Sequence, residues 1–398
     1  MVRMVAREQL EPYPRRFRAA PERNRRIARP LGLAGRVRTV DEDLLDAIGR
    51  RMSARDEVGA DLAAAMSRPR TDPDRVTMAA FHRALASPGA PTGNSALDRF
   101  LAAVEATPGW VDPALVERGG RALRRMGRTL DDVLLTLSLI GGYRFGGPAD
   151  LLVATGGLTG STAMRRLGET EEWARALIAP GGLRRDGEGW RLTVHVRAMH
   201  ALVNRRFETN GRWDVGHWGL PVNQADQAAT LGLFNSTGLL GVRALGWVVT
   251  PAESRAVMHL WRYVGWLMGV DDDFLFDTER AQNHFLYHVL LAQDDVTPAG
   301  PALARALVDG QHTAWRRRRL LGLLRWFLGR EGLRDLGLPT ALPWPVPGIV
   351  LGNLVRSVLV ARVPAGRRWL ERAGDAWTRG EIARRFAGAR PGVAPLPD

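Results

Sequence analysis

MRRLGET at residues 164–170 and TVHVRAMHA at residues 193–201 are the two segments on which the predicted fold depends. In the first segment Arg166 and Thr170 are four residues apart, which puts them on one face of a helix. The second segment puts His200 on a helix of its own. A guanidinium, a hydroxyl and an imidazole from two neighbouring helices can together hold a flat, anionic, metal-bearing ligand.

Helix start and stop signals recur on both sides of these segments. The first helix, 161–178, ends before Pro180 and two glycines, and the helix 190–206 carries His200. Thr250, Pro251 and Glu253 form a helix start with an N-cap, a proline at the first helical position and an acid at the third. Strand-like alternation never persists, so we predict an all-α fold.

Other boundaries follow from the same rules. Residues 39–43 predict the start of an amphipathic helix that continues to Met52, and a further helix is expected over 97–106. Thr129 and the two acids that follow Leu130 predict the cap of an apolar, interior helix over 133–140.

The composition restricts the kinds of chemistry. A hydrophobic share of 45% and a charged share of 25% are typical of a globular protein. The chain has no cysteine, which excludes disulfides, iron–sulfur clusters, thiolate-ligated haem and covalent haem attachment. Any metal must therefore be held by histidine or carboxylate.

The formal net charge of +14 would ordinarily suggest an anionic partner. The chain contains no lysine, however, and the arginines are spread through a sequence rich in Ala, Gly, Leu and Pro. This pattern indicates a bias towards GC-rich codons. No nucleic-acid-binding module accompanies the charge, so we expect no nucleic-acid partner.

The length of 398 residues is compatible with one large helical domain and extensions. We predict an exposed basic N-terminal arm over 1–38, a helical catalytic domain over 39–340 and a C-terminal helical extension, packed on it, over 341–398. Residues 14–18 contain two adjacent arginines but no apolar stretch follows, so the expected location is cytoplasmic.

Three other segments have residues that could form a binding site. The glycines of 141–160 lack the pattern of a phosphate-binding loop, and the acids of 271–273 lack the glycine and distal glutamate of a calcium loop. His284 and His288 are four apart and could chelate a metal, although the motifs of zinc and di-iron enzymes are absent. A non-haem metal enzyme therefore remains an alternative.

The segment 312–329 is both basic and apolar. Such a helix could lie on an anionic membrane surface, which would make the protein peripheral to the membrane. We favour the other interpretation, in which the helix docks on the core with its arginines in water. A basic interaction protein without catalysis, bound to membrane or nucleic acid, is thus a second alternative. The apolar run 349–363 is interrupted by Asn353 and Arg356 and does not meet the requirement for a spanning helix.

Four segments in this order resemble the latex clearing protein (rubber oxygenase) family. They are Arg166 with Thr170, the sequence HVRAMHA at 195–201, GLPVNQ with the acid Asp226 at 219–226, and WRYVGWLMGV at 261–270. The resemblance spans roughly 110–339.

The resemblance implies a helical protein with a globin-like core and a non-covalent b-type haem. It implies that His200 ligates the iron, and that Arg166 and Thr170 line the haem pocket. It also implies O2-dependent oxidative cleavage of an apolar, isoprenoid or alkene-containing substrate, with Asp150 as the candidate base. On its residues alone, His200 could instead be a core histidine satisfied by a backbone carbonyl, and His195 is expected to be structural.

The chain also departs from the family pattern. Glu169 occupies the position at which a rubber oxygenase can have a lysine as a distal haem ligand, and Asp150 is shorter than the glutamate proposed as a base in some members. The sequence also shows no export signal like that of the secreted rubber oxygenases, so a solid extracellular polymer is not the expected substrate. The sequence does not indicate the oligomeric state.

Overall fold

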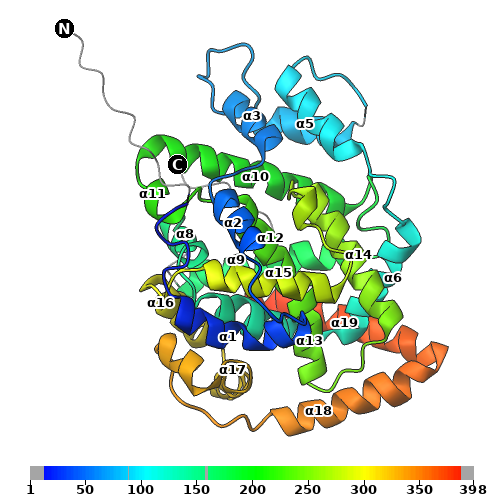
Figure 1. Cartoon of the computed structure of the whole chain (residues 1–398). Coiled ribbons are helices and arrows are strands. Elements are labelled where there is room, and N and C mark those ends of the chain that lie inside the picture. Colours follow the sequence, from blue (N-terminus) through cyan, green and yellow to red (C-terminus); the bar gives the residue numbers. More distant parts are fainter. Residues whose placement is uncertain (1–12, 88, 157–159, 387–398) are drawn as a thin grey trace.

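The computed structural model describes residues 13–87, 89–156 and 160–386, and within this part every regular element is a helix, as predicted (Figure 1). The first helices are α1 (Pro21–Ala34), α2 (Glu42–Arg51), α3 (Glu57–Met66), α4 (Met78–Ala86) and α5 (Ser95–Glu105). They are followed by α6 (Pro113–Met126), α7 (Arg128–Val133), the π-helix η1 (Leu134–Ile140), α8 (Pro148–Ala154), α9 (Gly160–Ile178) and α10 (Glu188–Asn210).

The middle of the chain contributes α11 (Val215–Trp218), α12 (Gln224–Phe234), α13 (Ser236–Ala244), α14 (Pro251–Leu267), the 3₁₀ turn η2 (Asp272–Phe274) and α15 (Glu279–Ala292). The last elements are α16 (Ala299–Asp309), α17 (Ala314–Asp335), α18 (Val346–Leu354), the π-helix η3 (Val355–Leu359), the 3₁₀ turn η4 (Val360–Arg362) and α19 (Pro364–Arg385). In Figure 1, α3 and α5 lie above α10, and α18 runs along the opposite edge.

Helix starts follow local capping chemistry. Asp41 accepts a hydrogen bond from the Leu44 amide, and Thr250 and Glu253 form the reciprocal capping box expected from the sequence. Thr129 is a wrong prediction. Gly127 stands at the N-cap of α7 without a side-chain cap, while the Thr129 hydroxyl is buried and donates to Asn353 Oδ1. The Thr129 hydroxyl therefore bonds to a distant residue and does not cap the helix.

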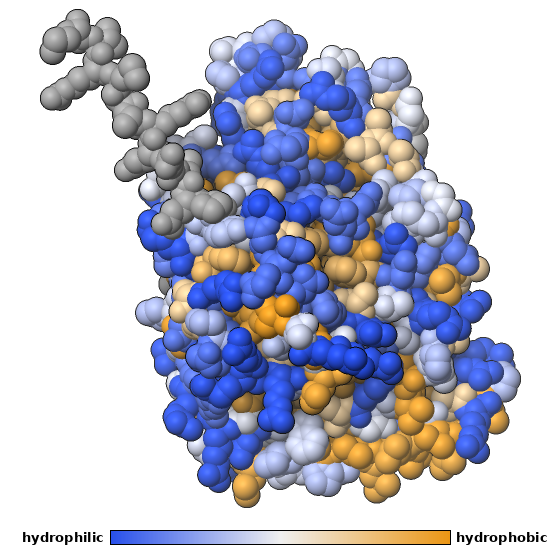
Figure 2. All heavy atoms as spheres, viewed as in Figure 1, coloured by the Kyte–Doolittle hydropathy of each residue, from blue (hydrophilic) through white to orange (hydrophobic). Residues whose placement is uncertain are grey.

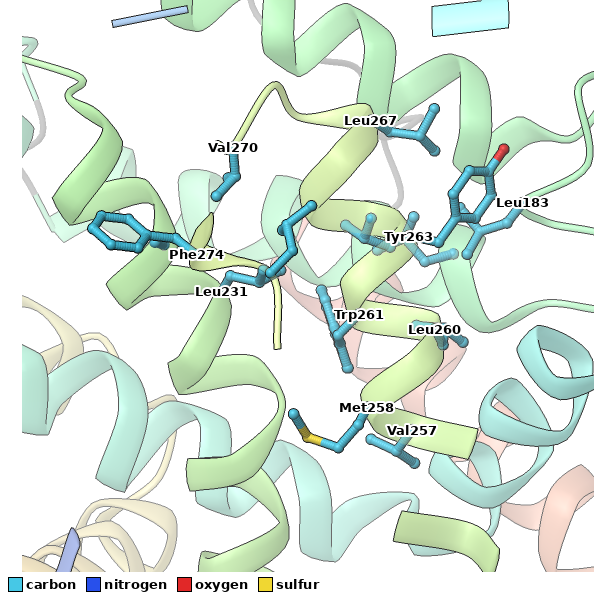
Figure 3. Packing of buried hydrophobic residues seen from close by; sticks show 14 of the residues in the cluster. Leu183, Leu231, Val257, Met258, Leu260, Trp261, Tyr263, Leu267, Val270 and Phe274 are labelled. Atoms are coloured by element: carbon cyan, nitrogen blue, oxygen red, sulfur yellow. The ribbon is translucent and has the colours of Figure 1, made fainter. Parts of the chain in front are cut away.

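The core is centred on α14, whose inner face is almost completely buried. Figure 3 shows Tyr263 of this helix beside Leu183, and Trp261 on the side of α14 on which Leu231 of α12 lies. A second apolar cluster lies between η1, α8, α16 and α17. The start of α9 belongs to this second cluster through Leu167, whereas α10 belongs to the first through Val194 and Ala198. The segments quoted from the sequence therefore meet where two apolar clusters join.

The basic N-terminal segment is not an exposed arm over its described part, so this prediction is wrong. Arg16 is fully buried; it forms an ion pair of 2.6 Å with Asp226 and a hydrogen bond with Gln293. Helix α1 packs along α15, and the buried Asn24 donates to the Gln293 carbonyl. Burial of a charged group requires a partner, and these partners lie more than 200 residues away. Residues 1–12 lie outside the described part.

Candidate functional site between helices α9, α10 and α12

Helices α9 and α10 run antiparallel and are joined at one end. A Cβ on Gly189 would meet the Ala176 carbonyl oxygen at 2.6 Å, and the Trp173 indole N–H donates to Thr193 Oγ1 at 3.1 Å. Arg166 lies seven residues before Trp173, and His200 lies seven residues after Thr193. Seven residues are two helical turns, or about 10 Å, so Arg166 and His200 lie at the same level on the facing sides of the two helices.

Helix α12 completes the site without packing closely against the backbone of α9 or α10. Side chains make the connections instead. The His200 ring nitrogen Nδ1 is 3.4 Å from Gln227 Oε1, and the Trp173 ring centroid is 5.6 Å from that of Phe234. Trp261 of α14 stacks on Phe234 at 5.0 Å and is 5.9 Å from Trp173. Three aromatic rings therefore form a floor to which α9 and α12 both contribute.

The faces that these three helices turn towards one another are incompletely buried. The residues concerned are all half-buried or exposed: Arg166, Thr170 and Trp173 on α9, Val196, His200 and Val203 on α10, and Gln227, Thr230 and Phe234 on α12. Apolar side chains on facing helices are normally closed over by their neighbours. We call this set of nine residues the three-helix slot.

The hydrogen bond of His200 defines which nitrogen is available. Because Gln227 Oε1 is an acceptor, Nδ1 carries the proton, and Nε2 keeps its lone pair. Nε2 has no hydrogen-bond partner among the described residues. Burial lowers the pKa of His200, with Gln227 and Asp56 acting in the opposite direction. The ring is thus neutral at neutral pH, which is the form that binds a metal ion.

A polar cavity of about 110 Å³ lies beside His200, where α10 faces α3. Its walls include Arg197, which pairs with Asp56 at 2.6 Å, and Arg55, which pairs with Glu208 at 2.6 Å. A cavity of this size can hold a few water molecules but not a macrocycle. Gln227 of α12 lines the cavity together with His200, so the cavity extends along His200 from α3 to α12.

Arg166 lies in the slot region but turns its guanidinium towards α8. Its Nη1 donates to Thr155 Oγ1 at 3.0 Å, and its Nη2 donates to the Thr155 carbonyl at 3.1 Å. A cation at this end of a helix is favoured by the helix dipole. Burial lowers the pKa of Arg166, while Glu169 and Tyr143 raise it. Arg166 thus fixes the end of α8 against α9.

The other predicted residues have separate surroundings. Thr170 is exposed and its hydroxyl donates to the Arg166 carbonyl at 3.0 Å, whereas Glu169 pairs with Arg165 at 3.2 Å. Asp150 caps the opposite end of α8, where Oδ2 accepts from the Gly147 amide and the Thr297 hydroxyl. Arg166 and Thr170 therefore lie on a helix that packs against the His200 helix, and Asp150 lies at the far end of the short helix α8.

The remaining histidines have partners of their own. His195 Nδ1 is 3.1 Å from His82 Nε2, outside the slot. His288 is fully buried: its Nδ1 donates to the His284 carbonyl and its Nε2 accepts from the Asp41 amide. Both nitrogens of His288 are thus occupied, so the predicted chelation by His284 and His288 does not fit. No cluster of three or more His, Cys, Asp or Glu suited to a metal occurs in the described part of the chain.

Sequence reasoning missed Gln227 and the aromatic floor. Gln227 follows directly after the motif at 219–226 and lies one helical turn after the N-cap Asn223. The motif therefore indicated this part of α12, but it did not indicate that Gln227 contacts His200. The floor brings together Trp173, Phe234 and Trp261, which lie in three separate helices. No local spacing predicts this meeting.

The fold identifies the class of protein first. The structure superimposes on that of latex clearing protein LCP in the closed state with a TM-score of 0.59, covering 87% of this chain and 95% of that chain at 20% identity. This likeness concerns the fold.

The sequence then identifies the family. Residues 123–363 match the model for the ER-bound oxygenase mpaB/B'/rubber oxygenase catalytic domain, and the chain belongs to this family. A rubber oxygenase of Streptomyces sp. (strain K30) is 28% identical over 153 residues, which are 36% of this chain. The matched stretch spans only 37% of the length of that relative. The predicted family and the all-α fold are both confirmed.

Proposed function

We propose that this protein is a b-type haem-dependent oxygenase in which His200 ligates the iron and the three-helix slot holds the macrocycle. The observation that carries the proposal is the Nε2 lone pair of a neutral, half-buried imidazole, which has no hydrogen-bond partner among the described residues. Membership of an oxygenase family supports the same assignment.

The residues of the slot fit such a group. A macrocycle needs one axial donor and two apolar faces, and the slot has His200 on one wall and the aromatic floor at one end. The indole N–H of Trp261, although buried, has no hydrogen-bond partner. Buried indole N–H groups normally have an acceptor, so this unpaired donor agrees with a site completed by a ligand.

Haem iron supplies the O2 and one-electron chemistry that amino-acid side chains lack. The residues of the chain hold and orient it. Gln227 fixes the protonated nitrogen of His200, which directs Nε2 into the slot. The Trp173 and Phe234 rings keep water from the floor, and Arg166 adds a positive charge near the anionic ligand while it holds α8 in place.

Asp150 is the proposed base that takes an allylic proton. Its Oδ2 is occupied by two hydrogen bonds, but Oδ1 accepts none from the described residues, so one oxygen remains available. Thr170 presents an exposed hydroxyl oxygen on the slot face of α9. The proposed substrate is an apolar alkene, such as an isoprenoid, and the proposed reaction is oxidative cleavage to carbonyl products. The proposed location is the cytoplasm.

Absorption spectroscopy tests the proposal. We expect the purified protein, or the protein incubated with haemin, to show a Soret band and a b-type pyridine haemochrome. The variant His200→Ala should lose the band, while His195→Ala, five residues earlier on the same helix, should keep it. A colourless wild type after incubation, or an unchanged band in His200→Ala, contradicts the proposal.

The reaction is tested separately on the haem-loaded protein. With an isoprenoid alkene and O2, we expect carbonyl products that hydrazine reagents detect, and Asp150→Asn should slow their formation without changing the Soret band. Products that carry a hydroxyl or hydroperoxide but no carbonyl would contradict cleavage.

A further inference from the structure

The helix α18 and the turn η3 that continues it are apolar on the side that faces away from the protein. The exposed fractions are 65% for Leu351, 41% for Leu354, 43% for Val355 and 59% for Leu359. These residues recur every three to four positions, so they form one stripe along the helix. We call them the α18 face. Figure 2 shows apolar surface gathered along the edge at which Figure 1 places α18.

The orientation of α18 is fixed by its inner side. Asn353 is fully buried, and its Nδ2 donates to the Leu245 carbonyl at 2.8 Å while its Oδ1 accepts from the Thr129 hydroxyl at 2.9 Å. Rotation of the helix to bury the leucines would break both hydrogen bonds and expose the amide. The α18 face is therefore held outward, and the cost of its exposure is not relieved within the chain.

The charged residues around the α18 face are all positive. No acid occurs between Asp335 and Glu371, whereas Arg356, Arg362, Arg367 and Arg368 all lie in this interval and are exposed. None of these four arginines forms an ion pair with the described residues. Arginines of α17 differ: Arg316 pairs with Glu381 and Arg319 with Asp132.

Tryptophans border the same surface. Trp344 and Trp369 flank the α18 face in sequence and are 51% and 53% exposed. Trp315 is 54% exposed and contacts Trp344, and both line a groove of about 250 Å³ together with Ile349 and Arg356. Tryptophan is enriched where a protein surface enters the boundary between lipid and water.

We propose that this surface docks on an anionic lipid membrane, with the α18 face lying in the boundary between headgroups and acyl chains. Apolar residues then leave water, the tryptophans lie at headgroup level, and the four arginines contact lipid phosphates. No helix of the described part is long and apolar enough to cross a membrane. The docking surface is formed by α18 and η3. The segment 312–329, which the sequence offered as a membrane-surface helix, does not have this role in the proposal because its Leu320 and Leu324 are buried.

Vesicle co-sedimentation tests the proposal. We expect the full chain to bind vesicles of phosphatidylcholine with about 30 mol% phosphatidylglycerol at least about tenfold more tightly than vesicles of phosphatidylcholine alone. The double variant Leu351→Asp, Leu359→Asp should bind at least about tenfold more weakly, because two side chains no longer enter the membrane. The double variant Arg362→Gln, Arg368→Gln should lose most of the preference for anionic vesicles.

Leu33→Asp is the matched control, since Leu33 is 74% exposed but lies on α1, away from the α18 face. It should bind vesicles as the wild type does. Circular dichroism and thermal melting establish that all variants are folded, and light scattering gives the molecular mass. Equal binding by wild type and the leucine double variant overturns the proposal. So does a wild-type dimer that ignores vesicles and becomes monomeric in the leucine variant, because the α18 face would then be a contact between two copies of this chain.

Discussion

His200 on α10 and His288 on α15 are helical histidines in largely apolar surroundings, and burial lowers the pKa of both. Both also carry the proton on Nδ1, which donates to Gln227 Oε1 in one case and to the His284 carbonyl in the other. They differ at Nε2. The Asp41 amide occupies this nitrogen in His288, whereas in His200 it has no hydrogen-bond partner among the described residues.

This difference separates a histidine that holds the fold together from one that is available to a ligand. At His288 every polar atom of the ring is used: one hydrogen bond stays within α15, and the other connects α15 to the start of α2. At His200 the protein orients the ring through one nitrogen and leaves the other open. Apolar surroundings and neutral charge are therefore insufficient to recognise a ligand, because the two sites share them.

Removal of His288 gives the largest expected loss of stability. The variant His288→Ala leaves the Asp41 amide without its acceptor and opens a cavity in the core, so we expect a loss of about 2–4 kcal/mol in the free energy of unfolding. Urea denaturation measures it. His284→Ala, which removes a ring that is one third exposed, should change the free energy of unfolding by less than about 1 kcal/mol.

The Soret band of the same variant tests whether His288, unlike His200, has no role in haem binding. If His288 has no ligand role, the His288→Ala protein that remains folded should bind haem as the wild type does. A lost band in a folded His288→Ala protein would remove the distinction drawn between the two histidines.

Substitution of Gln227 is expected to have the next largest effect, which is a loss of haem affinity. In Gln227→Leu the His200 ring loses its hydrogen-bond partner, and we expect haem to bind about 10- to 100-fold more weakly. Thr209→Val removes an exposed hydroxyl of α10 that lies outside the three-helix slot and should bind haem normally. Competition with apomyoglobin measures both. Equal affinity in wild type and Gln227→Leu would contradict the orienting role.

Substitution of Asp131 is expected to change the pH dependence of stability and not haem binding. Burial, followed by Glu171 and Asp132, raises the pKa of Asp131 from its ordinary value of 3.8 to about 8. Between these values the folded protein holds a proton that the unfolded chain has released, so this group lowers stability as pH rises from about 4 to about 8. Asp131→Asn removes that decline.

Thermal melting at two pH values measures this effect. We expect the gain in melting temperature from Asp131→Asn to be larger at pH 8 than at pH 5, while the Soret band stays the same. A gain that is larger at the lower pH would contradict the sign of the shift.

The sequence was sufficient to predict features that depend on residues close together in the chain. The capping box at Thr250 and Glu253 and the two helices that carry Arg166 and His200 were predicted from spacing alone. The resemblance added the family. Partners far along the chain were not predictable: the amide that donates to His288 is 247 residues from it, and the buried pair of Arg16 and Asp226 spans 210 residues.

The α18 face illustrates the same limit. The sequence of 349–363 showed an apolar run interrupted by Asn353 and Arg356, which argues against a spanning helix. Only the structure shows that Asn353 is directed inward to Leu245, which leaves the leucines outward. A polar residue in an apolar run can thus determine which side of a helix remains exposed.

The central claim is that His200 offers a free Nε2 to haem iron. The most direct test is the absorption spectrum of His200→Gly with haemin, recorded before and after imidazole is added. We predict that the Soret band is lost in the variant and returns with imidazole, which replaces the missing ring, whereas His288→Gly shows the wild-type band without it. A His200→Gly spectrum identical to that of the wild type before imidazole is added would contradict the claim.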